Sequence, residues 1–432
     1  MRQKKQGGRL KNRILQNGLM QSLLNMKGNA RTLIYIEPLW GIPFNLIAPF
    51  ATLYMNELGV DDVQIGILIS IAMVTQFFFA CIAGVVADKL GRKRTTMIGD
   101  FIGWTLPCLI WAVSQNVWFF LAAMVLNSLE QVNQTAWNCL MVEDADWDDT
   151  VNLYTWVSIG GLVSVFFAPI SGLLILHFAS VVPLMRGLYL FYACSMIVKN
   201  LITWKYTKET KQGRIRMAET KGVPFLTLLA EYRVLSPVFF RNKMLRATLI
   251  LVVLLNTAAI VNSNFFALYV KDSLGVPEQY LAFFPILRSV LMMLLMFLVL
   301  PRLTRLRLQI PMGTGLAAYI AAQLLLICSP AQNIAVLAVY TILEAVAIAL
   351  VMPRKDSMLV LYVDEKERAR SVSLLGAISL VITAPFGSII GFLSGIDRKY
   401  PFVFSVILYV AAFGVVLWMK EPAREADAVS GK

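Results

Sequence analysis

The sequence predicts an all-α integral membrane protein with about twelve transmembrane helices in two pseudo-symmetric six-helix bundles. Composition is the first reason: of 432 residues, 58% are apolar and only 15% are charged, against about 45–50% and about 25% in soluble domains. The second reason is the presence of twelve apolar runs that are long enough to cross about 30 Å of hydrocarbon as helices. The third is a set of short segments that recur in the second half of the chain.

The twelve predicted spans are helices rather than strands, because each backbone polar group inside lipid must find its hydrogen-bond partner within its own segment. They cover residues 33–55, 63–87, 97–113, 117–138, 157–177, 187–204, 248–270, 281–300, 310–328, 334–352, 371–394 and 402–419.

Five regions follow from the placement of these spans. They are a basic leader at 1–31, a first six-helix bundle at 32–204, a central linker at 205–247, a second bundle at 248–420 and a tail at 421–432. The leader has Lys or Arg at eight positions and no acidic residue. It fits an amphipathic helix on the membrane surface as well as a disordered tail. The linker is the longest polar connection and contains ten Lys or Arg residues.

The net charge of +13 is distributed unevenly along the chain. With the N-terminus in the cytoplasm, 33 of the 39 Lys and Arg residues fall on the cytoplasmic side and four on the opposite side. Cytoplasmic loops of membrane proteins carry such an excess, so we expect both termini in the cytoplasm. The positive charge then faces the lipid bilayer, and no nucleic-acid partner is needed to explain it.

Few residues are available for metal or cofactor chemistry. The five cysteines lie in or beside apolar segments without the spacing of a metal site, so we interpret them as small buried apolar side chains. The single histidine, His177, falls at the outer end of the fifth span. We therefore expect no metal, no cofactor and no enzymatic activity, and we expect the chain to be a monomer.

The recurring segments keep their order and a nearly constant offset of 214–216 residues. Residues 50–60 resemble 266–276, Gln64 matches Gln279, Leu129-Glu130 matches Leu343-Glu344, and Ala168-Pro169 matches Ala384-Pro385. Each half holds six spans, an even number, so the two halves have the same orientation. They are expected to repeat about an axis along the membrane normal.

The loop after the second span reads Gly84-Val-Val-Ala-Asp88-Lys89-Leu90-Gly91-Arg92-Lys93-Arg94. It resembles, at every specified position, the signature between helices two and three of the major facilitator superfamily (MFS), Gly-x-x-x-Asp-(Arg/Lys)-x-Gly-Arg-(Arg/Lys). Gly84 would let another helix approach closely, Gly91 permits a tight turn, and Asp88 can pair with Arg92 four residues on. The resemblance implies the MFS fold, and it implies that these four residues form a conformational gate.

In this family, the aspartate position holds the cytoplasmic ends of the two halves together when the carrier opens outward, and the corresponding surface here lies near Ser371. The alternative is an ordinary basic loop with turn glycines. The counterpart in the second half, at 301–307, lacks the glycines and the aspartate. An acidic loop follows the fourth span, and an ion pair between Arg92 and one of its acids is one hypothesis; a solvated loop is the other. Its acids are Glu143, Asp144, Asp146, Asp148 and Asp149.

Charged side chains at membrane depth are costly, so each needs a reason. Asp100 and Lys199 lie near the cytoplasmic ends of their spans, where such groups reach water, and we interpret them as structural. Glu130 and Glu344 occupy equivalent places in the repeat. The resemblance implies that helices one, four, seven and ten line a central cavity, so both carboxylates would face one water-filled path. Arg288 would bind an anionic group or pair with a carboxylate.

Polar side chains extend the candidate site along the same helices. The candidates for substrate binding or proton coupling besides Glu130, Glu344 and Arg288 are Glu37, Asn45, Asn127, Gln131, Gln134, Asn256, Asn262 and Asn264. On their spans they form polar stripes that would line one cavity. The alternative is that they make interhelical hydrogen bonds inside the bundles.

The resemblance implies a secondary active transporter that moves a small molecule by alternating access across the cell (plasma) membrane. No Gly-x-x-x-x-Gly-Lys-(Ser/Thr) loop occurs, so an ion gradient rather than ATP is expected to drive it. A buried carboxyl group can exchange a proton near neutral pH or pair with a cation, which favours H+ as the coupling ion.

We expect efflux of amphipathic or drug-like compounds, because the candidate site has carboxylates without a dense basic cluster and the cavity is expected to be rich in Phe, Met and Trp. Proton-coupled uptake of a sugar, peptide or other metabolite is the alternative. From another functional class, a transport-inactive membrane sensor is also compatible with the sequence.

Overall fold

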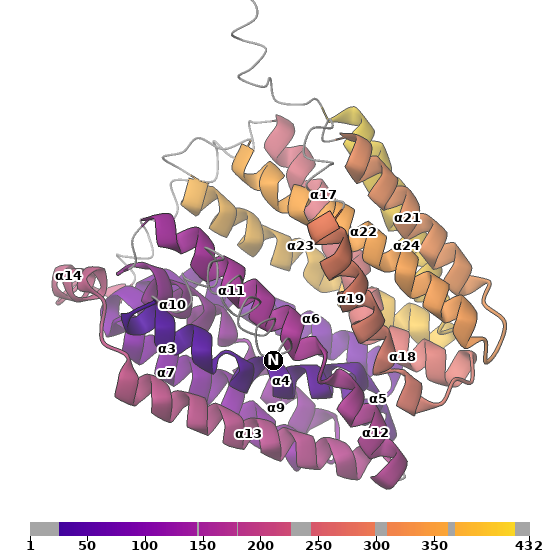
Figure 1. Ribbon diagram of the computed structural model, residues 1–432, viewed down its shortest axis with the longest axis horizontal. Coiled ribbons are helices and arrows are strands. Elements are labelled where there is room, and N and C mark those ends of the chain that lie inside the picture. Colours follow the sequence, from indigo (N-terminus) through magenta and orange to yellow (C-terminus); the bar gives the residue numbers. More distant parts are fainter. Residues whose placement is uncertain are drawn as a thin grey trace, which may run out of the picture.

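A computed structural model describes residues 26–144, 147–178, 180–225, 243–298, 309–361 and 368–419. Across these ranges the chain is helical and has no strand, as predicted. Figure 1 shows helices α3–α13 gathered on one side and α17–α24 on the other. The leader up to residue 25, linker residues 226–242, the segment at 301–307, the side chain of His177 and the tail at 421–432 lie outside the described part of the chain.

The first span consists of several short helices, because Pro38 and Pro49 lack the backbone N–H that a continuous helix needs. These helices are α3 (Gly28–Ile36), α4 (Pro38–Ile47), η1 (Ala48–Phe50) and α5 (Ala51–Glu57). α6 (Asp62–Leu90) forms the second span. It begins with a capping box, in which the Asp61 carboxylate accepts a hydrogen bond from the Gln64 N–H at 2.8 Å.

The remaining helices follow the predicted order. In the first half they are α7 (Arg92–Asp100), the π-helical turn η2 (Phe101–Thr105), α8 (Leu106–Ala112), α9 (Val117–Asn127), α10 (Glu130–Val142), α11 (Trp147–Val165), α12 (Ala168–Phe178) and α13 (Val181–Tyr206). The linker contains α14 (Lys211–Glu219). The second half contains α17 (Lys243–Asn264), α18 (Phe266–Leu268), η4 (Tyr269–Ser273), η5 (Glu278–Tyr280), α19 (Phe283–Leu298), α21 (Gln309–Ile327), α22 (Ile334–Leu361), α23 (Arg368–Ile396) and α24 (Tyr400–Trp418).

Ten helical segments within the described ranges are long and apolar enough to cross a membrane. They correspond to ten of the twelve predicted spans. The other two predictions, 97–113 and 117–138, fall on the interrupted helices α7–η2–α8 and α9–α10. Polar residues such as Asp100 and Glu130 stand at these interruptions and lower the apolar content of both segments. Of the twelve predicted spans, ten therefore match segments that are long and apolar enough to cross a membrane, and two do not.

Many large apolar side chains are exposed on the outside of the bundle, as expected where lipid replaces water as solvent. Trp118 is 71% exposed and Trp204 is 62% exposed; both lie near helix ends, where aromatic residues face the membrane interface. All five cysteines are free, but Cys81, Cys194 and Cys328 are exposed. The prediction of buried thiols is wrong for these three, because a small apolar side chain can face lipid instead of the core.

α6 of the first half and α23 of the second pack backbone against backbone. A Cβ atom on Gly66 would lie 2.5 Å from the Gly387 carbonyl oxygen, and one on Gly391 would lie 2.7 Å from the Gly66 Cα. The Ser70 hydroxyl oxygen accepts hydrogen bonds from the Ser388 N–H at 2.7 Å and from the Ser388 hydroxyl at 2.8 Å. Small residues thus let the two halves meet along this helix pair.

Polar contacts join the halves beside this helix pair. The Asp62 carboxylate accepts a hydrogen bond from the Ser394 hydroxyl at 2.5 Å and lies 3.3 Å from the Arg398 Nε. Lys271 of the second half pairs with Glu57 of the first. Partial burial lowers the pKa of Lys271, but its carboxylate partners raise it overall, so the ammonium stays charged. The end of the molecule where α6 begins and α23 ends is therefore closed.

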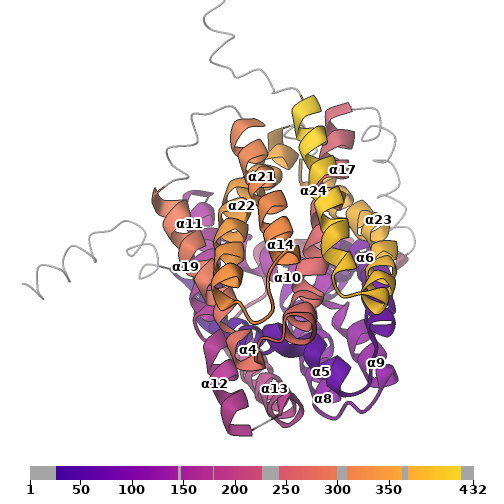
Figure 2. The same cartoon turned by 90° about the vertical axis from the view of Figure 1, so that its right-hand side faces the viewer.

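The contacts between the halves are concentrated at this closed end. In Figure 1, α5 and α12 of the first half lie next to α18 and α19 of the second, whereas α10 and α14 lie farther from the second half. Figure 2, turned by 90°, shows α5 and α12 below the helices of the second half. The two halves therefore diverge toward the end that carries α14.

The glycine contact predicts a specific destabilisation. Gly66→Ala should lower the free energy of unfolding by about 1–3 kcal/mol, because the added methyl group has no space against α23. Gly414→Ala on α24 is the control, since a Cβ there meets nothing within 4 Å. Thermal unfolding of the purified variants measures the difference. Equal unfolding midpoints for the two variants would contradict the backbone contact.

Candidate functional site

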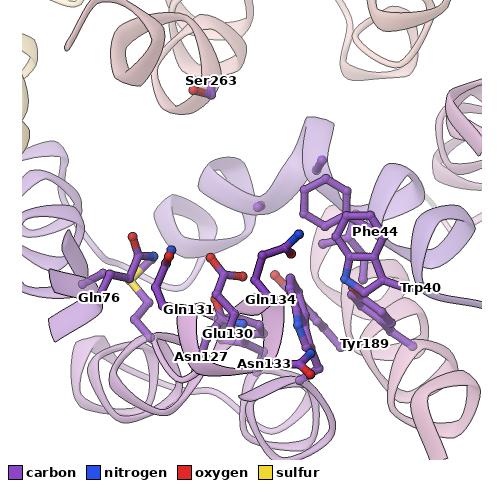
Figure 3. Close-up of a pocket in the computed structure, with 18 of the residues that line it drawn as sticks. Trp40, Phe44, Gln76, Asn127, Glu130, Gln131, Asn133, Gln134, Tyr189 and Ser263 are labelled. Carbon is purple, nitrogen blue, oxygen red and sulfur yellow. The ribbon is translucent and has the colours of Figure 1, made fainter. Parts of the chain in front are cut away.

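A cavity of about 780 Å³ is lined mainly by the first half. The second half contributes Ser263 and Asn264 from α17. Figure 3 shows Glu130 among amide side chains on one side of the cavity and Ser263 on the opposite side. The amides in that row are Gln76, Asn127, Gln131 and Gln134.

Glu130 occupies the first position of α10, where the fourth span is interrupted. The interruption is held on two sides. The Ser128 hydroxyl donates to the Ala72 carbonyl on α6 at 3.2 Å, and the Asn127 amide donates to the Gly103 carbonyl in η2 at 2.7 Å. Within the described part of the chain, no side chain forms an ion pair or a hydrogen bond with the Glu130 carboxylate, which points into the cavity. Glu130 is therefore available to a ligand or a proton.

Glu37 lies between α3 and α4, directly before Pro38, and lines the same cavity. Its Oε2 atom is buried and has no hydrogen-bond partner among the described residues. A buried polar atom without a partner is unfavourable. The position therefore suits a proton, a water molecule or a positive group of a ligand.

Aromatic side chains form a continuous wall of the cavity. The Trp40 ring stacks on Phe44 at a centroid distance of 5.1 Å and meets Trp104 edge-on at 5.7 Å; Trp104 is 5.7 Å from Tyr192. The sequence predicted a cavity rich in Phe, Met and Trp but did not identify these residues. The signal was present, however, because Trp40 and Phe44 follow Glu37 by three and seven residues and so share its helix face. The full aromatic lining is Trp40, Phe44, Trp104, Trp111, Trp137, Tyr189 and Tyr192.

The structure brings six of the predicted site residues together in this cavity. They are Glu37, Asn127, Glu130, Gln131, Gln134 and Asn264. Three others make hydrogen bonds inside the bundles. Asn45 donates to the Gly41 carbonyl at 2.8 Å, and Asn256 donates to the Ser379 hydroxyl on α23 at 3.2 Å. Asn262 accepts a hydrogen bond from Gln323 at 2.9 Å. Asn256 and Asn262 match the alternative of interhelical hydrogen bonds, whereas the Asn45 bond lies within α4.

Glu344 differs from the expectation that both repeat-related carboxylates face one path. It is 5% exposed, and its carboxylate lies 3.2 Å from an Arg288 guanidinium nitrogen. The residues that line the cavity include Glu130 but neither Glu344 nor Arg288. The repeat offset of about 215 explains the difference, because it aligns Arg288 with the neutral Met73. The second half therefore neutralises its carboxylate, whereas the first half leaves Glu130 without a cation.

Asp100 and Lys199 are placed differently from the prediction of groups that reach water. Asp100 is 0% exposed and Lys199 is 4% exposed, and they form an ion pair at 3.4 Å. Lys199 stands seven residues before the end of α13, about 10 Å along the helix. It also lines the cavity. Sequence reasoning missed this cation because its partner lies on another helix.

The predicted gate loop is built around a turn at Gly91, which joins α6 to α7 with a φ of 86°. Glycine adopts this left-handed conformation without strain, as predicted. Arg92 lies 2.6 Å from the Asp88 carboxylate and 3.0 Å from that of Glu143. The hypothesised ion pair with the acidic loop is thus present. The Glu209 carboxylate accepts hydrogen bonds from the N–H groups of Arg92 at 2.8 Å and Lys93 at 3.0 Å, which caps α7.

Asp88 also contacts the linker. Arg216 on α14 lies 2.9 Å from its carboxylate, and this hydrogen bond raises the pKa of Arg216. Gly84 lies within α6. The side chain of Ser371 and the acidic side chains from Asp146 to Asp149 are outside the described residues. The gate residues that the structure describes are thus held by α10 and α14.

Residues 40–353 match the family model of the Major Facilitator Superfamily. The chain belongs to the Major Facilitator Superfamily. The match covers more than half of the sequence and includes the 84–94 signature and the cavity residues from Trp40 onward. The protein is therefore a multi-pass integral membrane protein of a transporter family.

Two named relatives are similar to part of this chain. Multidrug resistance protein MdtG of Yersinia enterocolitica is 28% identical over 177 residues, which are 40% of this chain and 41% of that protein. Multi-drug resistance efflux pump PmrA of Streptococcus pneumoniae is 24% identical over 262 residues, 60% of this chain and 62% of that protein. The chain thus matches about two fifths of the length of MdtG.

Solved structures share the fold over nearly the whole of this chain. A mutant of the nucleoside transporter NupG has a TM-score of 0.73 at 16% identity and covers 91% of this chain and 100% of its own. A bacterial homologue of the human lysosomal transporter Spinster, solved inward-facing and unoccupied, has a TM-score of 0.68 at 16% identity, with 94% and 100% covered. At such identities the similarity shows the fold.

The Arg288–Glu344 pair predicts a rescue of stability. Glu344→Gln should lower the free energy of unfolding by about 1–3 kcal/mol, because it leaves a guanidinium at membrane depth without its counter-charge. Arg288→Met added to Glu344→Gln should recover most of the loss. Thermal unfolding measures both effects, with Glu130→Gln as the control because Glu130 has no ion-pair partner to lose. A double variant as unstable as the single one would disprove the pairing.

The Arg92 contacts predict a shift between conformations. Arg92→Met removes one of the two cations that hold the Asp88 carboxylate. Asp88 is then freer to contact the second half, so closure at the α14 end should become more favourable. The test places a cysteine at Ser263 in a chain whose native cysteines have been replaced. An impermeant maleimide added on the side of the α14 end should label it about fivefold more slowly in the Arg92→Met variant than in the chain with Arg92. Arg94→Met on the same helix is the control, since Arg94 is exposed. An unchanged labelling rate in the Arg92 variant would rule out the gate.

Proposed function

We propose that this superfamily member is a secondary active transporter that exports amphipathic or drug-like compounds in exchange for protons by alternating access. The observation that carries the proposal is a cavity of about 780 Å³ in which Glu130 and Glu37 accompany an aromatic wall. A cavity of this size suits a drug-sized molecule. Aromatic faces attract organic cations, and the carboxylates supply a counter-charge.

The same carboxylates support proton coupling. A carboxylate can hold a proton or attract a cationic group, but the proton removes the charge that attracts the cation. Each ligand therefore weakens binding of the other, and this coupling is reciprocal. Proton binding from outside would favour release of the substrate there, and substrate binding inside would favour release of the proton. Such competition is what an exchange mechanism needs.

Alternating access is supported by the unequal ends of the molecule. The α6–α23 contact and the bonds of Asp62 close one end, and the network around Arg92 lies at the other. We infer that the cavity is accessible from the α14 end in this structure. We assign that end and both termini to the cytoplasm, because 33 of 39 Lys and Arg residues then face it. The proposed location is the cell membrane, and the proposed functional unit is a monomer.

The names of the relatives support export. MdtG is described as a multidrug resistance protein and PmrA as a multi-drug resistance efflux pump. The cavity suits an amphipathic or drug-like substrate, since its charged groups are few and an aromatic wall lines it. An apolar substrate could enter it from the lipid-facing or cytoplasmic side.

Proton-coupled uptake of a hydrogen-bonding metabolite is the second candidate. The amide row beside Glu130 favours it, because four amides offer paired donors and acceptors to a sugar, a peptide or a nucleoside. Transport assays separate the two candidates. Inward movement of a nucleoside or dipeptide down a proton gradient, without movement of a lipophilic cation, would favour uptake.

The proposal predicts that Glu130 and Glu37 are each needed for gradient-driven transport. Loss of a hydrogen bond to a charged group costs about 1.5–3 kcal/mol, so Glu130→Gln should reduce proton-driven export of ethidium from proteoliposomes by about 10- to 100-fold. Glu37→Gln should flatten the pH dependence of the rate. Asp397→Asn, which changes an exposed acid at the closed end, is the control. If Glu130→Gln and Glu37→Gln both leave export and its pH dependence unchanged, the proposal is wrong.

A further inference from the structure

A buried acid–base cluster lies in the first half beside the cavity. The Lys199 ammonium nitrogen is 3.4 Å from both carboxylate oxygens of Asp100, and the Asn133 amide donates to one of them at 2.8 Å. Charged N–H···O bonds are ordinarily about 2.7–2.9 Å long, so the lysine is held loosely. Both ions are almost fully buried.

Several polar atoms around this pair are buried without a hydrogen bond among the described residues. They are the Asp100 Oδ2, the Asn133 Oδ1, the Tyr192 hydroxyl and the Glu37 Oε2. Glu37 interacts electrostatically with Lys199 and Asp100. Tyr192 interacts with Glu37, Asp100 and Glu130. Such a set of unsatisfied buried groups is rare in native structures and needs an explanation.

Charge counting supplies the explanation. Asp100 and Lys199 cancel, so an ionised Glu37 adds one uncompensated negative charge to a buried cluster. A net buried charge is unfavourable, and one bound proton removes it. We propose that Glu37, Asp100 and Lys199 form a second proton-binding site, separate from Glu130. This inference rests on the proposed proton-coupled transport. Glu37 and Lys199 line the cavity, which gives protons access to the site.

α7 and α10 connect this site to the gate loop. α7 begins at Arg92 and ends at Asp100; α10 carries Asn133 and is followed by Glu143. The two helices therefore share two polar junctions, Arg92–Glu143 at 3.0 Å and Asp100–Asn133 at 2.8 Å. They are also in close contact, since a Cβ on Gly99 would lie 2.6 Å from the Asn133 Cβ. A displacement of Asp100 is thus carried along α7 to Arg92.

The protonation state of Glu37 determines whether one or two ionised carboxylates attract Lys199. With Glu37 neutral, the lysine has a single ionised partner, Asp100. With Glu37 ionised, the lysine is attracted by carboxylates on two different helices and moves toward the α3–α4 junction. The Ser195 hydroxyl on α13 already donates to the Leu39 carbonyl at 2.6 Å, so α13 and the start of α4 respond together. Weakening of the Asp100 contact then loosens α7 and the gate.

The test uses infrared difference spectra of the purified full-length chain over a pH series without substrate, because they detect protonated carboxyl groups directly. The wild-type chain should show a carboxyl signal that Glu37→Gln removes and Glu130→Gln leaves in place. Lys199→Gln should raise the pH midpoint of that signal by about one unit or more, because the removed cation no longer opposes protonation. Lys205→Met, which changes an exposed cation on the same helix, should leave the midpoint unchanged.

The double variant Asp100→Asn/Lys199→Gln separates a proton site from a structural pair. Its neutral amides should restore the yield of folded protein, and the midpoint should be displaced less than in Lys199→Gln, because two opposing charges are removed together. A wild-type midpoint in Lys199→Gln alone would overturn the proposal, as would a double variant whose midpoint is displaced as far as that of Lys199→Gln. Failure of the proposed function is seen separately, as wild-type proteoliposomes that move ethidium without moving protons while the infrared signal is present.

Discussion

The backbone contact between α6 and α23 is the constraint on which the rest of the structure depends. Lipid provides no hydrophobic force to hold helices together, so close packing and hydrogen bonds must join the two halves. Gly66 and Gly391 allow the backbones to touch, and the bonds of Asp62 and Lys271 reinforce the same end. Because the halves are joined there in this structure, they diverge toward the opposite end. The cavity and the gate loop follow from this geometry.

The two halves share a fold but differ in chemistry. In the second half, Arg288 neutralises Glu344 at membrane depth. Among the described residues of the first half, no cation pairs with Glu130, and the buried Lys199 interacts with two carboxylates. The groups that can change charge are therefore concentrated in the first half. We propose that this half responds to protons while the second half forms a comparatively inert wall.

Features that depend on local chemistry could be predicted from the sequence, and those that depend on distant partners could not. Apolar run length predicted twelve spans, of which ten match segments long and apolar enough to cross a membrane, and the conformational freedom of glycine predicted the turn at Gly91. The repeat aligned Glu130 with Glu344, but it did not reveal that only Glu344 has a cation beside it. The burial of Lys199 depends on Asp100, which is 99 residues away in the chain. Contacts of this kind can be identified only once the three-dimensional arrangement of the helices is known.

The central claim is that protonation of the first half controls which end of the cavity is open. Distances between spin labels test it most directly, with one pair at Gln115 and Ala331 at the closed end and another at Arg94 and Lys243 at the α14 end. On changing the pH, we predict that one distance increases while the other decreases, with a common midpoint. Distances that stay constant, or that increase together, would contradict the account.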